Sequence, residues 1–308
     1  MVGQFAQMPG PLKINRRMVV PMLAGFLCRM RAARAKLSVP RRVVALDAPS
    51  TEMLAMLGIE PVGVAGLDGY RQTERDIPAL RHAVDIGFFY EPNLELLQFL
   101  KPDLFIGSFG VGAPADLLKR IAPVLSLPIY GGQDSSHEAA VQSLRQISGA
   151  MSRRDEAEAF LAAYQVRLSA LALSASAGPR RPVYLASLLL DGRHVILYGQ
   201  NSLFHKVLLH AGLRNAFVGE SSAWGIASVA IGTLDAAPDA VFLYIKSPVT
   251  QAALAALEQS PIWKALPFVK ARRIVPIPYL EMYGALPTAE RFADIVGMLV
   301  ERGTLDAD

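Results

Sequence analysis

Short apolar runs alternate with longer amphipathic segments along the chain from residue 42 onward. Apolar runs of four to eight residues between turn signals are typical of buried strands, and apolar positions three or four apart are typical of helices. The first part of this pattern predicts strands at 42–46, 61–65, 103–107 and 124–129, and helices at 52–57, 93–100 and 115–121. Strands that alternate with helices across short links predict right-handed crossovers and a largely parallel sheet.

Capping residues mark where several helices begin. The predicted caps are Ser50 and Thr51 before 52–57, Asn93 before 94–100, and Ser135, which forms a capping box with Glu138 at the start of a helix that reaches about residue 150.

A long segment without Gly or Pro, residues 153–176, predicts a single helix of more than about 20 residues. The alternation then restarts, with strands at 182–187, 194–198, 239–245 and 274–276 and helices at 202–211, 251–258 and 286–302. We therefore expect two α/β lobes, each a mostly parallel sheet flanked by helices, joined by one long helix. The expected boundaries are 36–150 for the N-terminal lobe, 151–177 for the connecting helix and 178–308 for the C-terminal lobe.

The positive charge of the chain is concentrated near its N-terminus. The sequence has 31 Lys and Arg against 27 Asp and Glu, a net charge of +4, yet six of the basic groups lie in residues 1–35, which contain no acid. The remaining 25 basic and 27 acidic groups give −2. The rest of the chain is nearly neutral, so its charge does not indicate a nucleic-acid partner.

Residues 1–35 resemble an export signal. Arg16 and Arg17 precede the apolar run Met18–Leu27, and Ala33-Arg34-Ala35 fits a small-x-small cleavage site. The paired arginines favour the twin-arginine route to the periplasm. The apolar run is too short to span a bilayer, which takes about 20 residues.

Cys28 is the single cysteine of the chain and lies inside this predicted signal. A lipoprotein signal is the alternative, although Leu27 is not the small residue expected before a lipidated cysteine. After cleavage at 35 the chain would contain no cysteine, so disulfides, Cys-ligated metals and thiol nucleophiles are not expected.

Motifs for catalysis are absent from the sequence. There is no G-x-G-x-x-G after a strand, no P-loop, no G-x-S-x-G and no H-E-x-x-H. His205 and His210 are five residues apart on a predicted helix, so they face different sides and do not chelate one metal together. We expect a protein that is not an enzyme and that has no cofactor of its own.

Several segments together resemble the iron–siderophore and cobalamin-binding proteins of ABC importers, and most closely the periplasmic branch that binds ferric hydroxamates. The similarity spans about residues 40–303. It rests on Arg42–Gly58, Pro61–Val64 and Glu91–Asp103 for the family, and on Asn201–Phe204, Gly219-Glu220, Trp224-Gly225, Pro261–Val269 and Tyr283–Ala285 for the branch.

The resemblance implies a monomeric binding protein that holds a ferric siderophore in the cleft between its lobes and delivers it to a membrane permease. The iron of such a ligand is held by the siderophore's own oxygens, so the protein needs aromatic walls and hydrogen-bond donors and no metal ligands. By motif, Trp224 matches a pocket tryptophan of the branch and Tyr283 a pocket tyrosine.

Three positions depart from the branch. Where the branch has a pocket arginine, this chain has Phe89. A pocket tyrosine of the branch is replaced by Val111, and a pocket tryptophan by Glu281. Phe89 cannot donate a hydrogen bond to the ligand as that arginine does. The candidates to replace this donor are Tyr90 and Arg71, and both are predicted to be ligand-binding residues.

Three carboxylates of the chain are further candidate site residues. We hypothesise that Glu281 pairs with a cationic group of the siderophore. The resemblance also implies that acidic side chains on each lobe dock on the permease, where Glu95 matches by motif and Glu220 is the choice for the C-terminal lobe.

Other ligands and one other class of protein stay open on the sequence. Cobalamin and haem are alternatives within the family, and Tyr90 is available as an axial ligand for haem. A secreted hydrolase on a similar α/β scaffold is the alternative from another class.

Overall fold

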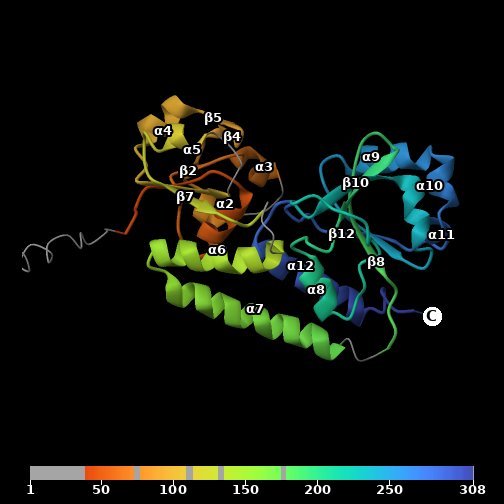
Figure 1. The fold of residues 1–308 in the computed structure, drawn as a ribbon. Helices are drawn as coiled ribbons and strands as arrows, with labels where there is room; N and C mark the ends of the chain where they lie inside the picture. Colours follow the sequence, from red (N-terminus) through yellow and green to blue (C-terminus); the bar gives the residue numbers. More distant parts are fainter. Residues whose placement is uncertain (1–38, 73–76, 109–113, 131–134, 175–177, 308) are drawn as a thin grey trace, which may run out of the picture. The chain divides into compact units, whose positions relative to one another are not determined.

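Two β-sheets with helices on their faces form the unit Pro40–Asp308, seen in the computed structural model of Figure 1. The structure describes residues 39–72, 77–108, 114–130, 135–174 and 178–307, with the backbone alone at Arg71 and Gln72. The predicted export signal, Cys28 and Val111 lie outside these residues. None of the described helices combines the length and apolar composition needed to cross a membrane.

The first sheet is parallel throughout, as the alternation of strands and helices predicts. Its strand order is β3-β2-β1-β6-β7, and we call this sheet with its flanking helices the N-terminal lobe. The strands are β1 (Val43–Ala45), β2 (Gly63–Val64), β3 (Val84–Asp85), β6 (Leu104–Ser108) and β7 (Val124–Leu127). The other elements of the lobe are α2 (Ala48–Met56), α3 (Leu67–Gln72), η1 (Pro78–Leu80), the paired strands β4 (Gly87–Phe88) and β5 (Glu91–Pro92), α4 (Leu94–Leu100) and α5 (Ala115–Leu118).

Helix α2 begins earlier than the sequence predicts, and its N-cap is Asp47 rather than Ser50 or Thr51. The Asp47 carboxylate accepts hydrogen bonds from the backbone N–H of Ser50 at 3.0 Å and from its hydroxyl at 2.6 Å. Thr51 donates back to the Asp47 carbonyl at 2.7 Å. Pro49 fits the first turn because the N–H that it lacks has no partner there. The two hydroxyl residues are therefore satisfied inside the helix.

The predicted caps of α4 and of α6 (Ser136–Ala150) are confirmed. The side chain of Asn93 accepts from the N–H of Leu96 at 3.0 Å, and that of Ser135 accepts from the N–H of Glu138 at 3.4 Å.

The second sheet mixes both strand directions. Its order is β10-β9-β8-β11-β12, with β8, β11 and β12 parallel and with β9 and β10 antiparallel to their neighbours. We call this sheet with its helices the C-terminal lobe. Its strands are β8 (Val183–Leu188), β9 (His194–Tyr198), β10 (Ile226–Ala230), β11 (Val241–Ile245) and β12 (Ile274–Ile277). Its helices are α8 (His205–His210), η3 (Ile231–Ala236), α9 (Thr250–Glu258), α10 (Pro261–Ala265), α11 (Pro267–Lys270) and α12 (Leu286–Glu301).

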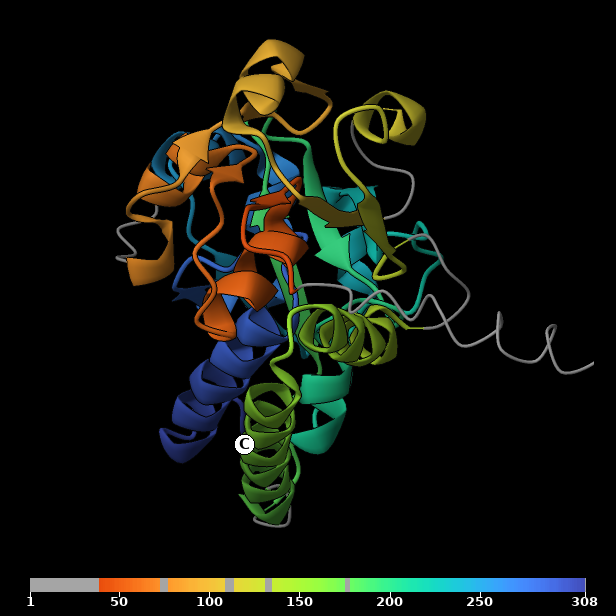
Figure 2. The same ribbon diagram turned by 90° about the vertical axis from the view of Figure 1, so that its left-hand side faces the viewer.

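A single helix of 21 residues, α7 (Arg154–Ser174), leads from α6 toward the second sheet, as predicted. It packs along α6 and α12 (Figures 1 and 2). The Arg167 guanidinium pairs with Glu290 at 2.9 Å and with Asp294 at 2.6 Å, both on α12. The boundaries at 150 and 178 stay predictions.

The hydrophobic core is continuous between the two lobes. One cluster of buried side chains includes Met53 on α2, Leu144 on α6 and Phe292 on α12. Phe292 meets Phe204, next to α8, edge to face at 5.0 Å between ring centroids. Because close-packed interiors resist deformation, we expect the lobes to rotate only slightly against each other.

His137 on α6 is a buried titratable group within this core. Its Nε2 shares a 3.0 Å hydrogen bond with the Tyr164 hydroxyl on α7, and its Nδ1 has no hydrogen-bond partner among the residues that the structure describes. The pKa of His137 is lowered from 6.5 to about 4, chiefly by burial, with Glu138 opposing this and Lys206 and His210 contributing to it.

This buried imidazole predicts a loss of stability in acid. The unfolded chain binds the proton near pH 6.5 and the folded chain near pH 4, so the contribution is complete above pH 6.5 and is lost as the pH falls toward 4. Between pH 7 and pH 4.5 we expect His137 to lower the free energy of unfolding by about 2 kcal/mol, at 1.36 kcal/mol per pKa unit. Urea unfolding at several pH values measures this slope.

His137→Gln should remove that part of the pH dependence. His82→Gln is the matched control because His82 is exposed, and it should leave the slope as it is. A His137→Gln slope equal to that of the unchanged protein would show that carboxylates alone set the acid limit.

Candidate functional site

A pocket lies where the first sheet changes direction. The chain runs outward from β1 to β2 and β3 on one side, while β6 and β7 lie on the other, so β1 and β6 flank a topological switch point. Ligands of parallel α/β sheets bind outside the carboxyl ends of the strands at such a point. Asp47 follows β1 and Ser108 ends β6, and the N–H of Ser108 donates to the Asp47 carboxylate.

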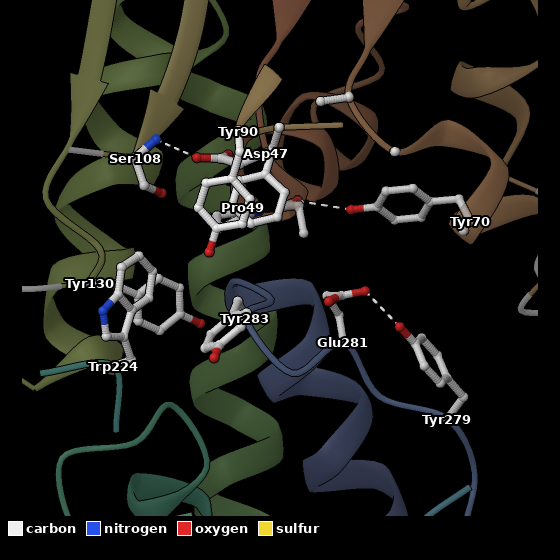
Figure 3. A pocket seen from close by; sticks show the side chains of 15 residues that line it. Asp47, Pro49, Tyr70, Tyr90, Ser108, Tyr130, Trp224, Tyr279, Glu281 and Tyr283 are labelled. Carbon is white, nitrogen blue, oxygen red and sulfur yellow. Dashed lines mark hydrogen bonds between the residues drawn. The ribbon is translucent and has the colours of Figure 1, made fainter. Parts of the chain in front are cut away.

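The pocket opens directly outside these two residues and has a volume of about 320 Å³ (Figure 3). Both lobes line it. The lining residues are Asp47, Ala48, Pro49, Ala65, Gly66, Gly69, Tyr70, Phe89, Tyr90, Ser108, Tyr130, Trp224, Tyr279, Glu281 and Tyr283.

Three rings from separate parts of the chain pack together on one wall. Tyr130 follows β7, Trp224 precedes β10 and Tyr283 precedes α12. Tyr130 stacks on Trp224 with centroids 5.5 Å apart, and Tyr283 meets Trp224 at 5.3 Å and Tyr130 at 5.8 Å, edge to face. We call these three residues the aromatic trio.

A second aromatic group lies on the opposite wall. Phe89 and Tyr90 are consecutive in the turn between β4 and β5, with their ring centroids 3.8 Å apart. Tyr90, which lines the pocket, keeps 61% of its surface exposed. Figure 3 shows the Tyr90 ring across the pocket from the aromatic trio. Exposed rings that face a pocket are apolar surface available to a ligand.

Some hydrogen-bond donors of the pocket lining already have an acceptor within the protein, and others do not. The hydroxyls of Tyr70, Tyr130 and Tyr279 donate to the Ala48 carbonyl, the Gly284 carbonyl and the Glu281 carboxylate, at 3.2, 2.5 and 2.7 Å. The unengaged donors, which have no hydrogen-bond partner among the described residues, are the hydroxyls of Tyr90, Tyr283 and Ser108 and the indole N–H of Trp224.

Burial keeps the tyrosines protonated. Burial raises the pKa of Tyr283, and the Tyr90 ring adds to that rise. Burial also raises the pKa of Tyr130 well above 10, with Glu52 and Glu281 as the next causes. At neutral pH these phenols are therefore donors, not phenolates.

The two lobes are tied beneath the pocket by Glu52 of α2. Its carboxylate accepts hydrogen bonds from the Ala285 N–H at 2.9 Å and from the Thr288 hydroxyl at 2.6 Å, in the first turn of α12. Gly284 lies against the same contact, since a Cβ there would stand 2.6 Å from Thr288 Cβ. A glycine is required at this close approach.

The pocket brings together five of the residues proposed from the sequence: Trp224, Tyr283, Glu281, Phe89 and Tyr90. The others are not placed in it. Arg71 follows the lining residue Tyr70 in α3, but its side chain lies outside the described atoms, as does all of Val111. Glu95 is exposed in the first turn of α4, and Glu220 is exposed four residues before Trp224. The roles of all nine residues in binding or docking stay predictions.

Sequence reasoning missed several residues of the pocket, chiefly Asp47, Tyr70, Ser108, Tyr130 and Tyr279. The position of Asp47 and Ser108 after adjacent parallel strands is a signal that could have found them. No comparable pattern marks the three tyrosines. Among the described residues there is no group of three or more His, Cys, Asp or Glu side chains able to hold a metal ion.

Known proteins with similar sequences and structures agree with this arrangement. The Iron(3+)-hydroxamate-binding protein FhuD of Escherichia coli is 34% identical over 287 residues, which cover 93% of this chain and 96% of the relative. The solved structure of the siderophore-binding protein FhuD of Vibrio cholerae with bound Fe3+–Desferal has a TM-score of 0.74 at 28% identity, and the match covers 84% of this chain and 98% of that one.

A periplasmic heme-binding protein of Pseudomonas aeruginosa has a TM-score of 0.65 at 23% identity, covering 85% of this chain and 92% of that one, which is a likeness of fold alone. Residues 43–279 match the periplasmic binding protein family. With two lobes, a pocket between them, and a relative that matches along nearly the whole chain, this protein belongs to the periplasmic binding protein family.

Proposed function

We propose that this protein is the substrate-binding component of an ABC importer, which captures a ferric hydroxamate siderophore in the periplasm and delivers it to the membrane permease. The observation that carries the proposal is the set of unengaged donors on aromatic walls, with Tyr90 on one side and Trp224 and Tyr283 on the other. The full-length relative in Escherichia coli, an iron(3+)-hydroxamate-binding protein, supports the class of ligand.

The chemistry of a ferric hydroxamate suits such a pocket. Three hydroxamate anions balance the charge of Fe3+ and fill its coordination sphere, so the complex presents oxygens that accept hydrogen bonds and methylene linkers that pack on rings. Neutral phenol and indole donors bind such oxygens without competing for the iron, and rings provide large rigid contact area. The protein then binds the complex and releases it unchanged.

The haem alternative, with Tyr90 as axial ligand, is tested by titration as described below. A hydrolase receives less support from the site. A hydrolase of the Ser-His-Asp type needs a histidine beside its nucleophile, and none of the described residues that line the pocket is a histidine. Cobalamin is tested by titration, as described below.

The surroundings of the protein in the cell follow from the same proposal. Residues 1–35 act as a twin-arginine export signal, and the mature protein works as a monomer. Glu95 and Glu220 meet arginines of the permease, one from each lobe, which sets orientation and encounter rate more than affinity. Both side chains are exposed, as docking requires.

Titration of the intrinsic fluorescence tests the proposed ligand. Trp224 lines the pocket, whereas Trp263 is 2% exposed and packs against Phe242 and Phe268 in the C-terminal lobe. We expect ferric hydroxamates to quench the emission, because an absorbing ferric complex would lie against Trp224, and we expect haem, cobalamin and ferric catecholates to bind more weakly.

Two variants assign the quenching. Trp224→Phe should remove most of its amplitude, and Trp263→Phe should keep it. Tight binding of haem or cobalamin together with no binding of any ferric hydroxamate would overturn the proposed function, and quenching unchanged in Trp224→Phe would remove Trp224 from the site.

A further inference from the structure

The pocket carries negative charge that its described lining does not balance. Asp47 and Glu281 are both in the lining, and no Lys, Arg or His is among the residues that the structure places there. The Asp47 carboxylate is used within the protein by the N–H and hydroxyl of Ser50 and by the N–H of Ser108. Glu281 is different, because only its Oε2 has a hydrogen bond, from Tyr279 at 2.7 Å.

Glu281 therefore keeps one carboxylate oxygen for a ligand. Its Oε1 has no partner among the described residues, and the half-buried side chain lies at the pocket wall between Tyr283 and Tyr279 (Figure 3). A half-buried carboxylate is stabilised by a cation that reaches it and destabilised by an anion. Its negative charge already acts on the neighbouring phenols, since Glu281 raises the pKa of Tyr70 and Tyr130 beyond the effect of burial.

The aromatic rings of the pocket also favour a positively charged ligand. Ring faces carry negative electrostatic potential and attract ammonium groups within about 6 Å of their centroids. Tyr283, Tyr90 and Trp224 line the same pocket as Glu281, so a cation bound there meets both a carboxylate and π faces.

We infer that this pocket selects ferric hydroxamates by charge, and that Glu281 receives a protonated amine of the siderophore. The inference rests on the proposed function and deepens it. The core of a ferric trihydroxamate is neutral, so the pendant group sets the charge of the ligand. An amine gives a cation that Glu281 balances, whereas a pendant carboxylate, or the excess negative charge of a ferric tris-catecholate, meets Glu281 and Asp47 with the same sign.

Three ferric complexes with one common core test the inference by calorimetric titration at pH 7. They are ferrioxamine B, which ends in a primary amine, its N-acetyl form, which is neutral, and its N-succinyl form, which ends in a carboxylate. We expect affinity to fall about tenfold from the amine to the acetyl form and by a similar factor again to the succinyl form, as for one partly screened charge contact in each step.

Variants separate ligand recognition from a structural role of Glu281. Glu281→Gln should weaken the amine form most and bring the amine and acetyl forms within about threefold of each other. Tyr279→Phe should keep or enlarge the preference for the amine, because it frees Oε2. Glu258→Gln, at an exposed carboxylate of α9, is the matched control and should preserve the full order.

The results distinguish charge selection by Glu281 from the binding of ferric hydroxamates itself. Equal binding of all three complexes overturns charge selection and leaves the proposed function standing. Binding of none of them overturns the proposed function itself. If Glu281→Gln and Tyr279→Phe weaken all three ligands alike, Glu281 serves only to hold Tyr279, and the inference fails.

Discussion

Replacing Glu52 by alanine is expected to lower the free energy of unfolding by about 3–5 kcal/mol, because two charge-assisted hydrogen bonds are each worth about 1.5–3 kcal/mol. Glu52 is 4% exposed, and its carboxylate binds Ala285 and Thr288 more than 230 residues further along the chain. The variant leaves the Thr288 hydroxyl and the Ala285 N–H without this acceptor. Urea unfolding followed by circular dichroism measures the loss.

The position of the carboxylate adds to the expected effect. The first N–H groups of a helix have no partner within the helix, and the helix dipole favours negative charge there. No side chain of α12 itself caps its start at Ala285, so Glu52 from α2 provides the negative charge and one acceptor. The contact also joins the helix that follows Asp47 to the helix that follows Tyr283, and we expect the Glu52→Ala protein to bind its ligand more weakly as well.

Conservative variants show which part of the contact matters. Glu52→Gln keeps the shape and one acceptor oxygen, so we expect a loss of about 1–2 kcal/mol, the value of the charge at a helix N-terminus. Glu60→Ala, at an exposed carboxylate between α2 and β2, is the control and should stay within about 0.5 kcal/mol. A loss for Glu52→Ala no larger than that of Glu60→Ala would mean that the lobes are held together without this tie.

The elements that the sequence predicts well are those with strong local signals. Residues 194–198 form β9 with the predicted bounds, α7 is unbroken because its segment lacks Gly and Pro, and Asn93 and Ser135 cap their helices. Strand β2 lies within the predicted strand 61–65, whereas β3, which was not predicted, has two residues and is too short for an alternation to show. Asp47 was missed as the cap because Ser50 and Thr51, three and four residues later, are equally good capping residues. Pro49, which lies between Asp47 and Ser50, also made a helix start before residue 50 less evident.

The pocket residues also differ in how far the sequence could predict them. The segments that carry the resemblance place five residues in the pocket, although these segments are far apart in sequence. Tyr130, Tyr70 and Tyr279 read as ordinary core or loop tyrosines, because their role depends on which segments the fold brings together. The tie between Glu52 and α12 could not be predicted either, since nothing local distinguishes Glu52 from an exposed helix carboxylate.

Replacing Gly225 by alanine should cost about 2–5 kcal/mol of stability, from left-handed backbone strain of about 1–2 kcal/mol and overpacking of about 1–3 kcal/mol. Gly225 has a φ of +76°, and a Cβ there would stand 2.6 Å from the backbone Cα of Ser202. That neighbour cannot move freely, because Asn201 beside it donates to the Ser222 carbonyl at 2.9 Å and accepts from Ser221 at 2.5 Å. Urea unfolding measures the loss.

A second effect follows from the neighbour of Gly225 in sequence, Trp224, which stacks on Tyr130 in the aromatic trio. A shift of the turn moves that ring, so the Gly225→Ala protein should also show altered indole emission and weaker binding of ferric hydroxamates. Gly58→Ala is the matched control, since Gly58 has a φ of +69° and nothing lies within 4 Å of its added Cβ. We expect it to lose only the strain of about 1–2 kcal/mol and to bind ligand normally. Equal losses in the two variants, with ligand affinity unchanged in both, would mean that the turn adapts and that the close approach of Gly225 to Ser202 does not position Trp224.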